Sequence, residues 1–273
     1  SRNLRQFLAG FFYELRAEEG YLPDLDDLQS ALEHACTHHD AASGADLAAA
    51  GAALDHVRGN MQGRRKRLAA AAALLPSAQG AARATLLELF SSAYASTADD
   101  CGVSRVDAAR ELVELRRQLG DPQRLYQALG RRALVAAMSA DRPTAEQLMA
   151  EGRRLERSDW PPRQRDWFRV WVGAVQSRLG DVQGLAQTVR ESLALAEQGG
   201  LENSAAMMQA EMFELALLEG DLPRAVETGR KAVVSLHRLG MTTTWALTNA
   251  YLCSAQALNG ELKEAAESAR AAQ

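Results

Sequence analysis

The sequence predicts an all-α fold, a right-handed superhelical solenoid of antiparallel helix pairs with a repeat of about 40 residues. Composition is the first observation behind this prediction. The 273 residues include 52 Ala and 38 Leu, but only 13 Val and no Ile. Ala and Leu favour helices, whereas strands need β-branched side chains to fill a pleated surface. A fold based on a β-sheet is therefore excluded.

The second observation is a turn signal roughly every twenty residues along the chain. Gly is favoured just past a helix end because it enters the left-handed backbone conformation without strain, and a following Asp caps the next helix. The stretches between signals carry apolar residues at helical spacing, such as Leu112, Leu115 and Leu119, and Ser104 with Asp107 forms a capping box. The signals fall at Gly20, Asp40, Gly59-Asn60, Gly80, Asp99-Asp100, Gly120-Asp121, Asp141, Asp159, Gly180-Asp181, Gly199-Gly200, Gly220-Asp221, Gly240 and Gly260-Glu261.

The third observation is that a step of forty residues aligns the first helix of each expected pair with the first helix of the next pair, and likewise the second helices. Ala145, Leu185, Ala225 and Ala265 form one such column, and its small apolar members would let paired helices approach closely. We therefore expect two parts: residues 1–42 as N-terminal capping helices that lead into the repeats, and residues 43–273 as about six helix pairs, the last one truncated. The chain begins and ends inside apolar patterns, so we expect it to be a segment of a longer protein.

Charge and cysteine content limit the classes of function. Against 31 basic residues stand 35 acidic ones, for a net charge of −4, so no overall basic field attracts nucleic acid. The longest Ala/Leu run, Leu68 to Leu75, is far shorter than the roughly 20 residues that span a bilayer, so no membrane partner is expected. Three widely spaced cysteines, Cys36, Cys101 and Cys253, do not form a disulfide framework, which favours the cytoplasm.

Two turns carry a resemblance to a known family. The segments 220–225 (Gly-Asp-Leu-Pro-Arg-Ala) and 260–265 (Gly-Glu-Leu-Lys-Glu-Ala) resemble the Gly-Asp-x-x-x-Ala turn of tetratricopeptide repeats. Asp141 to Ala145 keeps the Asp and the Ala, and Gly180-Asp181 keeps the Gly and the Asp. The resemblance covers residues 121–273 best and has a repeat of forty residues rather than 34. It implies a superhelix whose first helices line a concave groove.

A second resemblance lies in the N-terminal third. The segment 25–35 (Leu-Asp-Asp-Leu-Gln-Ser-Ala-Leu-Glu-His-Ala) resembles the stretch that enters the helical-repeat arm of bacterial signal-transduction ATPases and transcriptional regulators. This resemblance implies a non-catalytic interaction or sensor arm, which would bind a peptide, a protein or a small effector and contact neighbouring domains of the same chain. A stand-alone scaffold protein is the alternative, and an all-helical enzyme is a further one.

Three clusters of residues that could bind a metal or an anion also have ordinary structural explanations. His34 and His38, near Cys36, are spaced for two metal ligands, but imidazoles also stabilise helix C-termini, so we expect no metal. The basic run Arg64 to Arg67 would either bind an anion or form a solvent-exposed helix surface, and at least one of its side chains would face inward. Asp24 and Asp27 resemble magnesium-binding acids, but acids also cap helix starts. No catalytic constellation stands out, and we expect no cofactor.

The aromatic residues of 160–171 give the strongest candidate binding site. Trp171 lies forty residues from Arg131 and from Glu211, and Tyr251 follows after another forty. Trp, Tyr and Arg are enriched at binding hot spots, although large side chains also pack between repeats, and both interpretations stay open at this stage. The predicted groove, which would suit an amphipathic peptide with a positive charge, consists of Arg131, Trp167, Trp171, Glu211, Glu214 and Tyr251.

Overall fold

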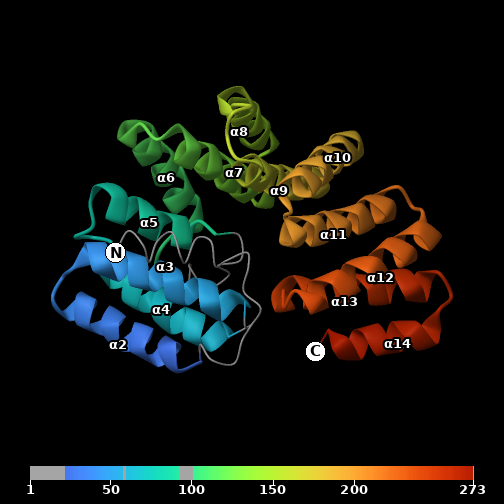
Figure 1. The fold of residues 1–273 in the computed structure, drawn as a ribbon, viewed down its shortest axis with the longest axis horizontal. Helices are drawn as coiled ribbons and strands as arrows, with labels where there is room; N and C mark the ends of the chain where they lie inside the picture. Colours follow the sequence, from blue (N-terminus) through green and yellow to red (C-terminus); the bar gives the residue numbers. More distant parts are fainter. Residues whose placement is uncertain (1–21, 58–59, 93–100, 273) are drawn as a thin grey trace. The chain divides into compact units, whose positions relative to one another are not determined.

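A computed structural model of the chain describes residues 22–57, 60–92 and 101–272. Within these residues the chain forms thirteen α-helices and no strand (Figure 1). The all-α prediction is therefore confirmed. The apolar pattern that the sequence shows between Leu4 and Leu15, and the predicted turn at Asp99-Asp100, lie outside the described residues.

The chain divides into two compact units at residues 139 and 140. The expected change from capping helices to repeats at residues 42 and 43 is a separate division, and it stays a prediction. The helices of the first unit are α2 (Leu22–Thr37), α3 (Ala41–Val57), α4 (Met61–Leu74), α5 (Gly80–Phe90), α6 (Arg105–Leu119) and α7 (Pro122–Met138). Here α2 packs on α3 and α4, α3 packs on α4 and α5, and α5, α6 and α7 follow in order.

The second unit is a run of seven helices in which neighbours in sequence pack together. They are α8 (Arg142–Leu155), α9 (Pro162–Leu179), α10 (Val182–Gly199), α11 (Glu202–Leu218), α12 (Leu222–Arg238), α13 (Thr242–Leu258) and α14 (Leu262–Ala271). Each helix contacts the next, and α11 also contacts α9 and α13 (Figure 1). Consecutive packing of helix pairs is compatible with a helical-repeat solenoid.

The predicted turns explain where these helices begin and end. Gly180, Gly200, Gly220, Gly240 and Gly260 all adopt positive φ, between 63° and 85°, just past a helix. Aspartates then cap the following helices, as predicted: the carboxylates at 121, 141, 181 and 221 each accept a backbone N–H of the first helical turn at 2.9–3.2 Å. At the capping box, Ser104 Oγ likewise accepts the Asp107 N–H at 3.3 Å.

The small column predicted for the second helices is buried. Ala145, Leu185 and Ala225 are fully inaccessible and Ala265 is nearly so. Ala225 belongs to an apolar cluster with Phe213, and α11, α12 and α13 meet there. A side chain larger than alanine at position 225 would have to displace this cluster. The alignment by forty residues thus identifies positions where paired helices approach each other.

Candidate functional site

Five of the six predicted groove residues lie in the second unit. Trp171, Glu211 and Tyr251 occupy the same position in α9, α11 and α13, because these helices begin at residues 162, 202 and 242. Arg131 belongs to α7 of the first unit, where its Nη1 donates to the Glu88 carbonyl at 3.4 Å.

The two tryptophans differ in exposure. Trp171 is only 4% exposed and therefore packs as a core side chain, whereas Trp167 is half-buried. Their ring centroids lie 5.4 Å apart with the planes at 75°, an edge-to-face arrangement that aromatic pairs favour. Of this pair, only Trp167 retains surface that a partner can reach.

Helix α13 carries a row of exposed apolar side chains. Leu247, Tyr251 and Leu258 share one side of the helix by their spacing, and Tyr251 is 46% exposed. No residue between Thr242 and Leu258 is charged. On α11 the equivalent positions include Glu211 and the half-buried Glu214. Helix α13 therefore has an uncharged surface, whereas α11, which it contacts, carries an acidic pair.

Glu211 is a buried carboxyl group that packs against α9. It is 8% exposed, and its Oε2 accepts no hydrogen bond from any described residue. Gly173 of α9 lies against it, and a Cβ added at that glycine would lie 3.8 Å from Glu211 Cδ, an ordinary contact distance. Burial raises the pKa of Glu211 to about 8, and the nearby charge of Glu214 adds to this effect while that of Arg178 opposes it. Glu211 is therefore mostly protonated at neutral pH.

Asp166 is a second buried carboxyl group at the contacts of α9 with α10 and α11, and its environment is different. It is 2% exposed. Its Oδ1 accepts a hydrogen bond from the hydroxyl of Ser192 on α10, and its Oδ2 accepts one from the hydroxyl of Ser204 on α11. Burial raises its pKa to about 6, against the opposing effects of the Ser192 hydrogen bond and the charge of Arg169. Because both of its oxygens already accept serine hydroxyls from neighbouring helices, Asp166 joins three helices.

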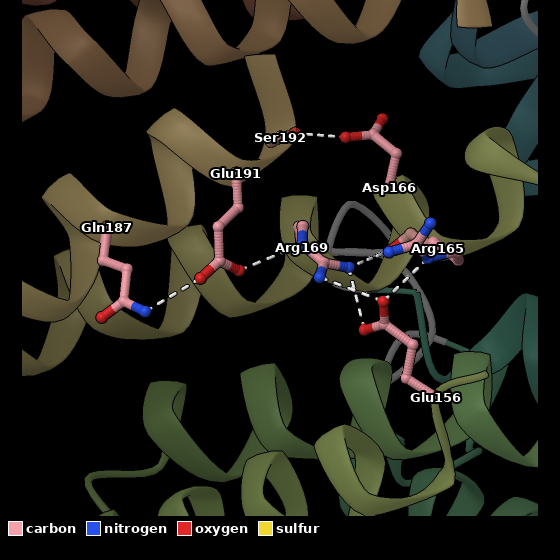
Figure 2. Close-up of polar contacts among 7 residues, drawn as sticks. All are labelled: Glu156, Arg165, Asp166, Arg169, Gln187, Glu191 and Ser192. Carbon is pink, nitrogen blue, oxygen red and sulfur yellow. Dashed lines mark hydrogen bonds and ion pairs between the residues drawn. The ribbon is translucent and has the colours of Figure 1, made fainter. Parts of the chain in front are cut away.

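An ion-pair network surrounds the start of α9 (Figure 2). Glu156, at the end of α8, receives both Nη atoms of Arg169 at 2.9 and 3.0 Å, and Arg165 Nε at 2.9 Å. Arg169 Nε also donates to Glu191 of α10 at 3.2 Å, and Glu191 accepts from Gln187 at 2.9 Å. The two-point Arg169–Glu156 contact, 14–15% exposed, fixes the α8–α9 connection against α9.

Sequence reasoning missed Asp166, Ser192 and Ser204. A signal was present, because Asp166 precedes the buried Val170 and Gly173 by four and seven residues and therefore shares their helix face. Charge alone suggested a surface position.

The other candidate clusters have local partners in the structure. The His34 and His38 rings lie 4.0 Å apart, and His38 Nδ1 contacts the His34 carbonyl at 2.9 Å, at the end of α2. In the basic run, Arg64 and Arg67 are both buried, and Arg67 Nε pairs with the buried Asp55 at 2.7 Å. Arg65 and Lys66 are exposed, so the run is a solvated face only in part.

No family model matches the chain, and no curated protein is found to be similar to it. Among the described residues, no helix has the length and apolar character needed to cross a membrane.

Proposed function

We propose that the chain is a non-catalytic interaction module that binds a positively charged amphipathic protein segment on one side of its second unit. The proposed surface, which we term the α9–α13 face, consists of Trp167, Glu211, Glu214, Leu247, Tyr251 and Leu258. The observation that carries the proposal is the exposed, uncharged row on α13, a helix that contacts α11, together with the acidic pair on α11. Apolar contact would supply affinity, and the acids would set the orientation of the bound segment.

The proposal includes a tetratricopeptide-like solenoid with a repeat of forty residues. Helices α7, α9, α11 and α13 begin at 122, 162, 202 and 242, and α8, α10, α12 and α14 begin at 142, 182, 222 and 262, which supports this repeat. The packing of α11 on both α9 and α13 supports it as well, since first helices of successive repeats stack in a solenoid.

We further propose that the module is an arm of a larger bacterial signal-transduction or transcriptional regulator, with a stand-alone scaffold as the alternative. The resemblance of residues 25–35 to the start of such arms supports the regulator. The coding sequence around this chain tests it: a P-loop upstream would support the regulator, whereas a start codon directly before Ser1 would support the scaffold.

Binding is tested with a fluorescent amphipathic helical peptide of leucine and lysine, and with a control peptide in which glutamate replaces lysine. The lysine peptide is expected to bind and the glutamate peptide is not. Leu247→Asp combined with Tyr251→Asp should weaken binding at least about tenfold, a change of about 1.4 kcal/mol in binding free energy. Val234→Asp, at a position of α12 that is 68% exposed, is the control and should bind normally. Equal binding by all three proteins would refute the proposed face.

A further inference from the structure

The contacts of α9 with its neighbours contain two buried carboxyl groups, and the described residues supply a hydrogen-bond donor to both oxygens of only one of them. Asp166 has a serine hydroxyl on each oxygen. Glu211 Oε2 is equally buried but accepts nothing from the described residues. A buried acceptor without a donor is unfavourable, by roughly 1–3 kcal/mol in typical proteins. The fold can evidently place hydroxyls at this interface, so their absence at Glu211 indicates a position for a donor from outside.

The charges around Glu211 favour a positively charged donor. On its own helix the next acid is Glu214, whose carboxylate accepts the hydroxyl of Ser177 from α9 and is thereby held in place. Arg178 of α9 is the cation that acts on Glu211, but its side chain is exposed to solvent.

The remaining neighbouring helices add no compensating charge. On α10, the apolar Leu185 lies beside Gly173, and the charged side chains at 190, 191 and 197 are exposed. On α12 the charged residues are exposed or, for Arg224, paired with Glu219. Helix α13 contains no charged residue. Two neighbouring acids with one solvent-exposed counter-charge form a site of negative potential when both are ionised.

We propose that Glu211 and Glu214 together bind one ammonium or guanidinium group of the partner segment, and that Glu211 releases its proton when that group binds. The inference rests on the proposed function, since the segment must lie on the α9–α13 face. In the free protein the Glu211 carboxyl keeps its proton. On binding, the O–H bond breaks, the proton passes to solvent, and the carboxylate accepts an N–H from the incoming cation. The incoming cation thus compensates the new negative charge of Glu211 in the buried site.

Proton release makes the affinity depend on pH in a defined direction. Because the cation needs the ionised carboxyl, affinity should rise about tenfold per pH unit below the pKa of Glu211, and it should level off above that pKa. The lysines of a probe peptide keep their charge over the same range, since their ordinary pKa is about 10.4. The pH dependence therefore reports the protein group and not the peptide.

The experiment measures binding of the leucine–lysine peptide to the intact chain between about pH 6 and pH 9, in buffers that differ in their heat of protonation. For the wild-type protein we expect affinity to increase with pH, with close to one proton released for each peptide bound near pH 6 and progressively less as the pH passes the pKa of Glu211. Glu211→Gln should bind more weakly, with no proton release and a flat pH profile. The control variant Glu197→Gln, which makes the same substitution at an exposed position of α10, should behave as the wild type.

Two results would overturn the inference and separate it from the proposed function. If the peptide binds the face with no proton release and no pH dependence, the role of Glu211 is refuted while the interaction face stands. If the peptide fails to bind at every pH, both fall together. The thermal midpoint of each variant is measured alongside, so that a loss of binding is assigned only to folded protein.

Discussion

Replacing Glu211 with glutamine should make the second unit more stable at high pH, and the gain should depend on pH. The ordinary pKa of a glutamate is 4.5, and that of Glu211 in the folded protein is raised to about 8. Between these values the native state holds a proton that the unfolded state has lost, so rising pH favours unfolding. Glutamine is neutral and nearly the same size, and it removes this dependence.

The magnitude follows from the interval between the two pKa values. Each tenfold difference in proton affinity corresponds to about 1.4 kcal/mol, so the full interval amounts to roughly 4–5 kcal/mol. The glutamine variant should be close to the wild type in stability near pH 4 and should exceed it by up to that amount near pH 8, on the order of one kcal/mol for each pH unit. Above the folded-state pKa the difference should stop growing.

Urea denaturation followed by tryptophan fluorescence measures this difference across the pH range. The comparison between the two proteins cancels the contribution of Asp166, whose pKa is also raised but which both proteins share. Glu197→Gln is the control and should track the wild type at all pH values. A difference between the Glu211→Gln variant and the wild type that stayed constant from acid to alkaline pH would show that Glu211 ionises normally, and the argument from burial would fail.

Four further substitutions test the packing and the turns. Gly173→Ala should stabilise the protein by about 0.5–1 kcal/mol, because the added methyl meets its neighbours at 3.7 Å or more. Gly152→Ala should destabilise it, because the methyl would lie 2.2 Å from Phe168. Thermal midpoints of the two variants that move in the same direction would contradict this. Ala140→Gly should raise stability by about 1 kcal/mol by relieving a φ of 58°, and an unchanged unfolding curve would argue against strain there. Ala225→Arg should destabilise by several kcal/mol by placing a charge in a fully buried site, and a thermal midpoint within about a degree of the wild type would refute that packing.

Local features of this fold could be predicted from sequence because they depend on neighbours along the chain. Left-handed glycines and capping aspartates need only a helix end and the residues beside it, so Gly220 with Asp221 was predictable from the turn alone. The buried column around Ala225 could also be predicted, since small residues recur there at a fixed step.

The contacts between first helices could not be predicted in the same way. An alignment by forty residues identifies equivalent positions, but equivalent positions are not the ones that touch. Asp166 and Ser204, which share a hydrogen bond, are 38 residues apart, and Ser177 and Glu214, which share another, are 37 apart. The burial of Trp171 is a related case: the periodic pattern gives its helix face, whereas its depth depends on how neighbouring side chains fill the space.

The packing order of the second unit has a consequence for how it folds. Each helix makes its substantial contacts with the next helix, or with the next but one, so no distant ends of the chain need to meet before the core can form. Closing short loops loses little conformational entropy, and such topologies fold quickly. Folding can therefore nucleate at any adjacent pair and spread in both directions, and α14, whose substantial contacts among the described helices are with α13, should be the first to fray.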